Sequence, residues 1–320
     1  MFKKKLGFLA GVMVLLSLAG YLLCLLAGDS KQLNKEEFLL VTSFYPMYVL
    51  AENLTDGVAG VGVSNLTENQ TGCLHDYQLR PEDMQLLEHA DAFLINGAGM
   101  ELFMERVMEK NTGLTVIEAS HGIDLLEAEG HHHHTHGDEE EAEHDEHDHE
   151  EHAGNGHVWM DVERYRKQLD NVTQELIRLM PEQEEALQRA SAVYEEKLVT
   201  LSEEVMLVKE LSNGMPVVIF HEAFAYLAES LGMEVLAEVS LDENTMPSPG
   251  ELAELIEEIK YHGKALILIE EAHKEYADKI MAETDAKTVY LDPLTTGEEN
   301  ADSYLLGMQN NLDAIREVLK

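Results

Sequence analysis

The sequence predicts an α/β protein of two lobes. Each lobe is expected to contain a four-stranded, mainly parallel sheet flanked by helices, and one long rigid backbone helix is expected to join them. Three observations lead to this prediction. The 320 residues suffice for two modest domains. Short apolar runs alternate with helix-like segments in both halves of the chain, as they do in parallel sheets. A long amphipathic segment at residues 181–211 separates the two halves.

The N-terminal lobe is expected at residues 38–180. Pro81 suits the first turn of a helix, and the Asn-Thr-Gly run at 111–113 suits the end of one. Short apolar runs between such helices indicate strands. We expect strands at 38–44, 58–66, 92–95 and 114–118, and helices at 46–56, 81–89 and 100–110.

The C-terminal lobe is expected at residues 212–320, where the same alternation repeats. A second parallel sheet with helices on its faces follows from this repetition. We expect strands at 216–220, 234–239, 265–269 and 288–291, and helices at 222–231, 249–261, 274–283 and 303–319.

The connecting helix is predicted at residues 181–211. Pro181 suits its start, and the Ser-Asn-Gly run at 212–214 suits its end. At about 1.5 Å per residue the segment would be roughly 46 Å long. A flexible linker would be short and rich in Gly or Ser, so we expect no large hinge motion between the lobes. The apolar positions at helical spacing are Leu187, Val193, Tyr194, Leu198, Leu201, Val205 and Val208.

The charge of the chain narrows the class of ligand. Its hydrophobic content of 45% is ordinary for a globular protein with a core. Its formal net charge of −40 argues against nucleic acid and anionic membrane as direct ligands. Solubility or the handling of cations is the expected use of such a charge.

The N-terminus has the pattern of a secretory segment. Lysines 3–5 precede an uncharged apolar run at 6–27, so residues 1–28 are predicted to be a signal or membrane anchor. Lipid attachment at Cys24 is an alternative to an uncleaved anchor, although residues 21–23 lack the small residue that a bacterial lipoprotein signal has before its cysteine. Free secretion is the third possibility. In each case the body is expected outside the cytoplasm, and in the first two it is tethered to the cell surface.

Four residues in the predicted loops have side chains that bind metals. Ligands of open α/β sheets lie beyond the carboxyl ends of the strands. His221 and Asp292 directly follow predicted strands, whereas His75 and His157 lie in loops of the N-terminal lobe. Three imidazoles and a carboxylate suit tetrahedral Zn²⁺. The separations along the chain are large, so spacing alone leaves surface or capping roles open for each histidine.

Five motifs, in order, resemble the zinc branch of the metal-binding solute-binding proteins of ABC importers. The resemblance covers nearly everything after about residue 38. The motifs are VTSFYPMY at 41–48, HDYQLRPEDMQLLEHADAFLINGAGME at 75–101, GHVWMD at 156–161, FHEAFAYLAESLG at 220–232 and YLDPL at 290–294.

This resemblance implies a fold, a ligand set and a partner. It implies two α/β lobes joined by one long helix, with metal bound between them by His75, His157, His221 and Asp292. In zinc-specific members water or another carboxylate can replace the aspartate. The manganese and iron branch has a carboxylate in place of the third histidine, so the imidazole at 221 favours Zn²⁺. The implied role is delivery of Zn²⁺ to an integral membrane ABC permease by a non-enzymatic protein, which we expect to be a monomer.

A histidine-rich tract interrupts the N-terminal lobe. Nine histidines and ten carboxylates lie between His131 and His152. The loop at 119–156 has no helix or strand period and is predicted to be disordered. Our hypothesis is that it captures Zn²⁺ weakly and raises the supply to the main site. A solvated insertion without a role is the alternative.

Three other functions stay open at this point. One is an importer component for manganese or another divalent metal. A second is a zinc hydrolase, because the run HEAFA at 221–225 begins like the H-E-x-x-H motif, although its fifth position is Ala225. A third is an extracellular metal buffer or adhesin in which the histidine tract is the working part. No G-x-x-x-x-G-K-[ST] loop is present, so ATP hydrolysis for uptake is expected on separate subunits.

Overall fold

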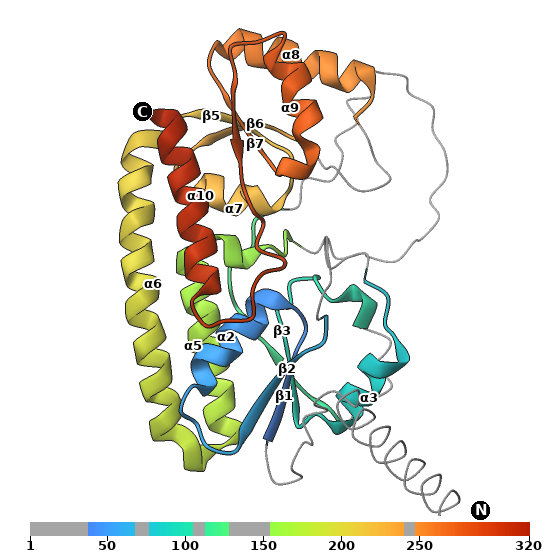
Figure 1. Cartoon of the computed structure of the whole chain (residues 1–320), viewed down its shortest axis with the longest axis vertical. Coiled ribbons are helices and arrows are strands. Elements are labelled where there is room, and N and C mark those ends of the chain that lie inside the picture. Colours follow the sequence, from blue (N-terminus) through green and yellow to red (C-terminus); the bar gives the residue numbers. More distant parts are fainter. Residues whose placement is uncertain (1–37, 68–76, 105–112, 128–153, 240–246) are drawn as a thin grey trace, which may run out of the picture. The chain divides into compact units, whose positions relative to one another are not determined.

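The computed structural model describes residues 38–67, 77–104, 113–127, 154–239 and 247–320 (Figure 1). Residues 38–320 form one compact unit. This unit contains two four-stranded sheets of order β2-β1-β3-β4 and β6-β5-β7-β8, and every strand pairing within them is parallel. The predicted fold class is therefore confirmed.

The inner strands of the first sheet are buried. Strand β1, one of its two inner strands, has buried residues from Leu39 to Thr42, as expected for a parallel strand with helices on both faces. Strand β2 begins three residues later than predicted, because Gly57 and Gly60 adopt positive φ angles in the turn before it. The elements are β1 (Phe38–Thr42), α2 (Tyr45–Thr55), β2 (Val61–Asn65), α3 (Pro81–His89), β3 (Ala92–Ile95), the 3₁₀ turn Leu102–Met104 and β4 (Thr115–Glu118).

The second sheet repeats this arrangement. Helix α8 starts with a capping box, in which the Glu251 amide donates to Ser248 Oγ and the Ser248 amide donates to the Glu251 carboxylate. It ends at Gly263, whose φ of 81° suits glycine. The elements are β5 (Pro216–Ile219), α7 (Ala223–Ser230), β6 (Glu234–Glu238), α8 (Pro249–His262), β7 (Leu266–Ile269), α9 (Lys274–Met281), β8 (Lys287–Tyr290) and α10 (Ser303–Leu319).

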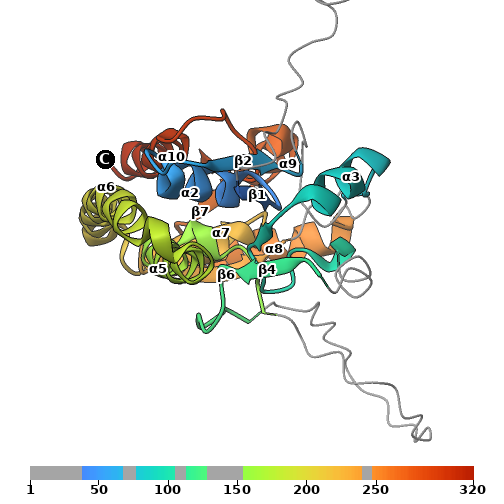
Figure 2. The same ribbon diagram turned by 90° about the horizontal axis from the view of Figure 1, so that it is seen from below.

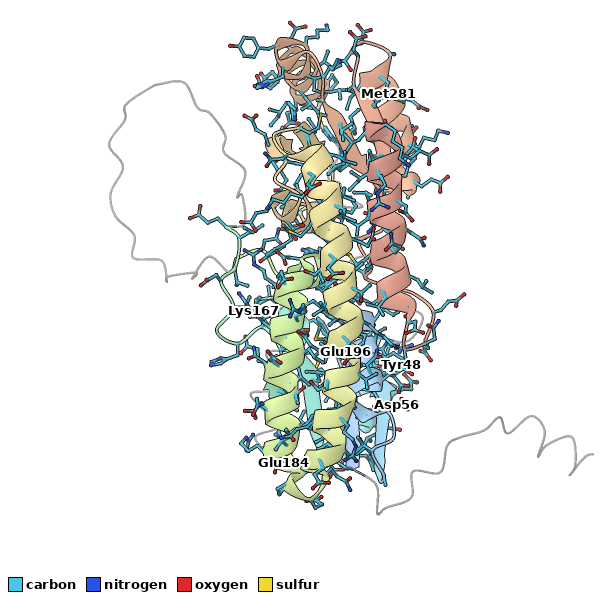
Figure 3. The ribbon with its side chains drawn as sticks, turned by 90° about the vertical axis from the view of Figure 1, so that its left-hand side faces the viewer. Tyr48, Asp56, Lys167, Glu184, Glu196 and Met281 are labelled. Carbon is cyan, nitrogen blue, oxygen red and sulfur yellow. The ribbon has the colours of Figure 1, made fainter. Side chains whose placement is uncertain are left out.

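Along the chain, two long helices come between the last strand of the first sheet and the first strand of the second. Helix α5 (Val162–Leu179) is followed by the 3₁₀ turn Pro181–Gln183 and by α6 (Glu184–Ser212). Helix α6 has 29 residues, so it is about 44 Å long. It packs against α5, α2 and α10, and Figure 3 shows α5, α6 and α10 side by side. Helix α10 also contacts α2, as Figure 2 shows. The predicted connecting helix is present, but α5 was not predicted.

Three tyrosines join these helices in the core. Tyr165, Tyr194 and Tyr304 are fully buried, and the rings of Tyr165 and Tyr304 stack with centroids 4.0 Å apart. The Tyr304 hydroxyl donates to the Trp159 carbonyl at 2.7 Å. Sliding of α10 along α5 would break this stack and this hydrogen bond. The packing is consistent with a rigid connection.

Several predicted features lie outside the described residues. They are the predicted anchor at 1–28, His75 and the tract from His131 to His152. The described ends of the predicted loop, 119–127 and 154–156, contain neither helix nor strand. Across the described ranges, none of the helices is long and apolar enough to cross a membrane.

Candidate metal centre

Two of the four predicted ligands lie against each other. His157 is at the end of the loop before the 3₁₀ turn Val158–Met160, and His221 comes two residues after β5. Their ring centroids are 5.0 Å apart and the ring planes are at 87°. His157 is fully buried and His221 is partly exposed. The fold thus brings together imidazoles that are 64 residues apart in the chain.

The His157 ring is fixed by its neighbour Asn155. The Asn155 side-chain oxygen lies 3.1 Å from His157 Nδ1 and accepts the His157 amide at 3.0 Å. A carboxylate oxygen of Glu222 lies 3.4 Å from the same ring nitrogen. These acceptors place the ring proton on Nδ1, which leaves the lone pair of the neutral ring on Nε2. Nε2 is then the atom that can bind a metal.

The His221 ring has the opposite arrangement. The amide of Ala223, the first residue of α7, donates to His221 Nδ1 at 3.0 Å. In the neutral ring the proton is therefore on Nε2. Metal binding through Nε2 needs the proton on Nδ1 and loss of this hydrogen bond, at a cost of about 1 kcal/mol.

Buried aromatic side chains pack against one side of the His157 ring. Trp159 is fully buried, its ring centroid is 5.1 Å from that of His157, and it packs edge-on against Phe44 at 5.0 Å. Its indole N–H donates to the carbonyl of Pro293 at 2.9 Å. Trp159 therefore excludes water from one side of the His157 imidazole. Its hydrogen bond joins Pro293, the residue after Asp292, to the loop that carries His157.

A buried polar network supports the His157 loop from below. The side-chain amide of Asn96 donates to the Gly156 carbonyl at 2.9 Å. The Glu101 carboxylate accepts the amides of Asn96 and Gly97 and the hydroxyl of Ser43. Burial raises the pKa of Glu101 to about 7, although these donors oppose the shift. The network fixes the loop that carries His157.

Gly156 is required by close packing. A Cβ atom at this position would lie 2.6 Å from the Met100 sulfur and 2.9 Å from the Ala98 carbonyl oxygen. Ala98 has a φ of 53° between two glycines that also have positive φ angles. This tight turn lets the backbone approach Gly156, and a side chain there would displace His157.

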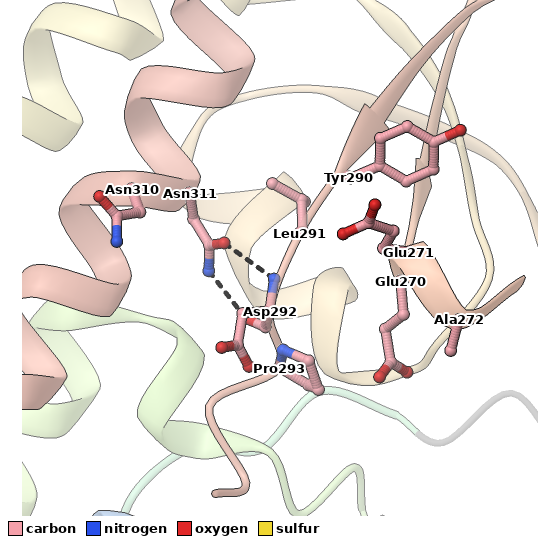
Figure 4. Close-up of a pocket in the computed structure, with 9 residues that line it drawn as sticks. All are labelled: Glu270, Glu271, Ala272, Tyr290, Leu291, Asp292, Pro293, Asn310 and Asn311. Carbon is pink, nitrogen blue, oxygen red and sulfur yellow. Dashed lines mark hydrogen bonds between the residues drawn. The ribbon is translucent and has the colours of Figure 1, made fainter. Parts of the chain in front are cut away.

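Asp292 lies in a separate pocket in this structure. The pocket, about 370 Å³ in volume, also contains Glu270 (Figure 4). These two carboxylates follow the neighbouring strands β8 and β7. Burial raises the pKa of both, and the charge of Asp292 contributes to the rise of Glu270 to about 7. A cation here would reverse both shifts.

The backbone of Asp292 is held by one asparagine. Asn311 accepts the Asp292 amide at 2.9 Å and donates to its carbonyl at 2.8 Å (Figure 4). The Asp292 carboxylate itself accepts the Leu294 amide. In the part of the chain that the structure describes, no three His, Cys, Asp or Glu side chains are grouped closely enough to hold a metal. His157, His221 and Asp292 therefore do not form a complete site by themselves.

His75 belongs to the segment 68–76, which is outside the described residues, so its role as a ligand stays a prediction. Asn155 is a functional candidate that the sequence alone does not single out. Its only signal is a polar side chain two residues before His157, and its partner Glu222 is 67 residues further along the chain.

Comparison with known proteins identifies the family. The model of the family described as "Zinc-uptake complex component A periplasmic" (ZnuA) matches residues 40–318. The chain is 31% identical to the high-affinity zinc uptake system protein ZnuA of Bacillus subtilis, covering 100% of this chain and 99% of that protein. It is 27% identical to the zinc-binding protein AdcA of Streptococcus pyogenes, covering 95% of this chain but only 61% of that longer protein.

Solved structures agree with this result. The metal-dependent lipoprotein YcdH from Bacillus subtilis has a TM-score of 0.68 at 27% identity, covering 88% of this chain and 98% of that one. FpvC from Pseudomonas aeruginosa has a TM-score of 0.71 at 24% identity, covering 88% and 99%. The second likeness shows the fold alone. Together with the sequence matches, these findings show that the chain belongs to the ZnuA family, the periplasmic zinc-binding components of zinc-uptake complexes.

Proposed function

We propose that this chain binds one Zn²⁺ outside the cytoplasm and delivers it to an integral membrane ABC permease. The proposed ligands are His75, His157 and His221, with Asp292 in the fourth position. The contact between the His157 and His221 rings is the observation that carries the proposal.

The distance between these rings suits a shared zinc ion. With a Zn–N bond of about 2.0–2.1 Å, an imidazole centroid lies about 3.2 Å from the metal. Two such ligands at a tetrahedral angle have centroids about 5.2 Å apart. The observed separation is 5.0 Å. The separation of the two rings is therefore compatible with one shared ion, once His221 carries its proton on Nδ1 and gives up the hydrogen bond from Ala223.

The donor set favours zinc over manganese. Imidazole nitrogen suits Zn²⁺, whereas Mn²⁺ prefers carboxylate and water oxygen. Zinc is also the metal named for the relatives AdcA and ZnuA. Zn²⁺ is here the transported substrate. Cu²⁺ and Ni²⁺ would also bind such a donor set by intrinsic affinity, so selection for Zn²⁺ must come from geometry and supply.

A binding role suits this centre better than hydrolysis. A zinc peptidase of the H-E-x-x-H type needs a second histidine four residues after the first on a helix. Here His221 lies before α7, and the corresponding position is Ala225. A centre with four protein ligands has no open position for a catalytic water.

We infer that the chain is tethered by its N-terminus, acts as a monomer, and relies on separate subunits for ATP hydrolysis.

Zinc analysis of the purified chain tests the proposal. His157→Ala and His221→Ala are each expected to lower the affinity of the tightest zinc site by at least about 100-fold, since each removes a ligand. His89→Ala is the control, because His89 is exposed at the end of α3. Tight zinc binding that survives both ligand substitutions would refute the ligand set. Chelator-sensitive peptide cleavage would refute the non-enzymatic role.

Deletion of residues 131–152 separates import from buffering. One tight Zn²⁺ is expected to stay bound, while several weakly bound ions are lost with the nine histidines. If the tight site disappears with the tract, the chain is a buffer whose working part is the tract.

A further inference from the structure

We propose that Asn155 is a positioning residue that fixes the zinc-binding tautomer of His157 and ties this ring to the backbone beside His221. The inference rests on the proposed function, in which both histidines bind zinc. Asn155 itself would not touch the metal. It would act through the hydrogen bonds that its buried side chain makes.

The hydrogen-bond partners on the two sides of the Asn155 side-chain amide determine which of its atoms is the oxygen and which is the nitrogen. On one side its nitrogen lies 2.7 Å from the Glu222 carbonyl oxygen, which can only accept. On the other side its oxygen accepts the His157 amide, which can only donate. A flipped amide would place oxygen against oxygen and nitrogen against nitrogen. The oxygen therefore faces His157.

This orientation sets the tautomer of His157. The same oxygen lies 3.1 Å from His157 Nδ1, so that nitrogen must carry the proton. The lone pair of the neutral ring is then on Nε2 before any metal arrives. Hydrogen bonds from metal-bound histidines to such acceptors typically change metal affinity by 10–100-fold.

The same side chain links the two halves of the centre. Glu222, whose carbonyl accepts from Asn155, is the residue after His221. The backbone carbonyl of Asn155 in turn accepts the Tyr226 hydroxyl of α7 at 2.6 Å. Asn155 is 2% exposed, so water cannot easily replace these contacts. The spacing of the two imidazoles thus depends on one residue that is not a ligand.

The Glu222 carboxylate also faces His157 Nδ1 and could share this role. A Glu222 carboxylate oxygen is 3.4 Å away, which is longer than the contact with Asn155. After loss of Asn155 it would accept a longer hydrogen bond from Nδ1–H, so part of the Nδ1–H population is expected to persist in Asn155→Ala. We therefore expect Asn155→Ala to weaken zinc binding by about 10–100-fold rather than to abolish it.

The tautomer can be measured without zinc. In metal-free protein at about pH 8.5, imidazoles with an ordinary pKa near 6.5 are neutral, and long-range ¹⁵N–¹H correlation spectra distinguish the tautomers. The His157→Ala spectrum identifies the His157 signals among the 16 histidines. The wild type is expected to show the Nδ1–H form, and Asn155→Ala is expected to shift His157 toward the Nε2–H form.

Asn155→Asp separates the two roles. A carboxylate still accepts from His157 Nδ1, so the Nδ1–H form is expected to persist. It cannot donate to Glu222, so zinc affinity is expected to fall between the wild type and Asn155→Ala. Asn53→Ala is the matched control. Asn53 is also a buried asparagine that joins distant parts of the chain, through Ala301, but its partners exclude His157. It is expected to change neither tautomer nor zinc affinity.

Three results would overturn the inference. They are an Nε2–H form in the wild type, an Asn155→Ala protein with unchanged tautomer and affinity, and an equal loss of affinity in Asn53→Ala. The wild-type spectrum decides the matter even if Asn155→Ala fails to fold. Failure of the proposed function is distinguishable, because His157→Ala would then keep tight zinc while the tautomer result stands.

Discussion

The indole nitrogen of Trp159 lies 2.9 Å from the carbonyl oxygen of Pro293, and 134 residues separate them in the chain. This hydrogen bond joins the residue two positions after His157 to the residue next to Asp292. It links the loop that carries His157 to the segment that follows β8. The consequences of such contacts can be measured.

Trp159→Phe is expected to lower the free energy of unfolding by about 1–3 kcal/mol, because it leaves the buried Pro293 carbonyl unsatisfied. Urea denaturation of metal-free protein gives this quantity. Tyr261→Phe is the control, since Tyr261 is 85% exposed. A variant as stable as the wild type would show that the hydrogen bond contributes nothing.

Gly156→Ala is expected to destabilise the protein by about 1–3 kcal/mol, because the added methyl group would overlap Met100 and the Ala98 carbonyl. It is also expected to weaken zinc binding by moving His157. Gly62→Ala in β2 meets nothing within 4 Å and should do neither. Equal behaviour of the two variants in denaturation and zinc titration would contradict the packing argument.

Glu101 is expected to make stability depend on pH. Its pKa is raised from 4.5 to about 7, so the folded state binds this proton more tightly than the unfolded chain does. The contribution is fully present below about pH 4.5 and is lost as the pH rises through 7, by about 3 kcal/mol. Denaturation of metal-free wild type and Glu101→Gln between about pH 5 and 8 measures it. If the two proteins have the same pH dependence, Glu101 is not responsible.

Asp292→Asn tests the fourth ligand. Loss of a carboxylate ligand is expected to weaken zinc binding at least about tenfold, or ~1.4 kcal/mol. The effect should be smaller than that of His157→Ala, since the carboxylate lies in its own pocket in this structure. Asn310→Ala, which changes the same pocket, should leave affinity unchanged. An unchanged Asp292→Asn titration would assign the fourth position to water or another carboxylate.

The sheets could be predicted because their strands are short apolar runs. The buried strand at 39–42 can be recognised from its own apolar residues, without knowing which segments pack against it. The strand order β2-β1-β3-β4 could not be predicted in this way, because it depends on crossovers between segments far apart in the chain. Helix α5 was missed although its signal is present. Its buried residues Val162, Tyr165, Leu169, Val172 and Leu176 are spaced by three and four.

The sequence likewise predicted some features of the candidate metal centre and not others. The types and loop positions of His157 and His221 pointed to metal, and the fold places their rings in contact. The role proposed for Asn155 could not be predicted, since its second partner, Glu222, is 67 residues further along the chain and reaches Asn155 only when the two halves of the chain pack together. For the same reason the sequence could not show that Asp292 lies in a pocket with Glu270.

A crystal structure of the zinc-loaded protein is the decisive test of the proposed ligand set. It is expected to show one Zn²⁺ with Nε2 of both His157 and His221 at about 2.0–2.1 Å. A tightly bound zinc that contacts only one of these two rings, or neither, would contradict it.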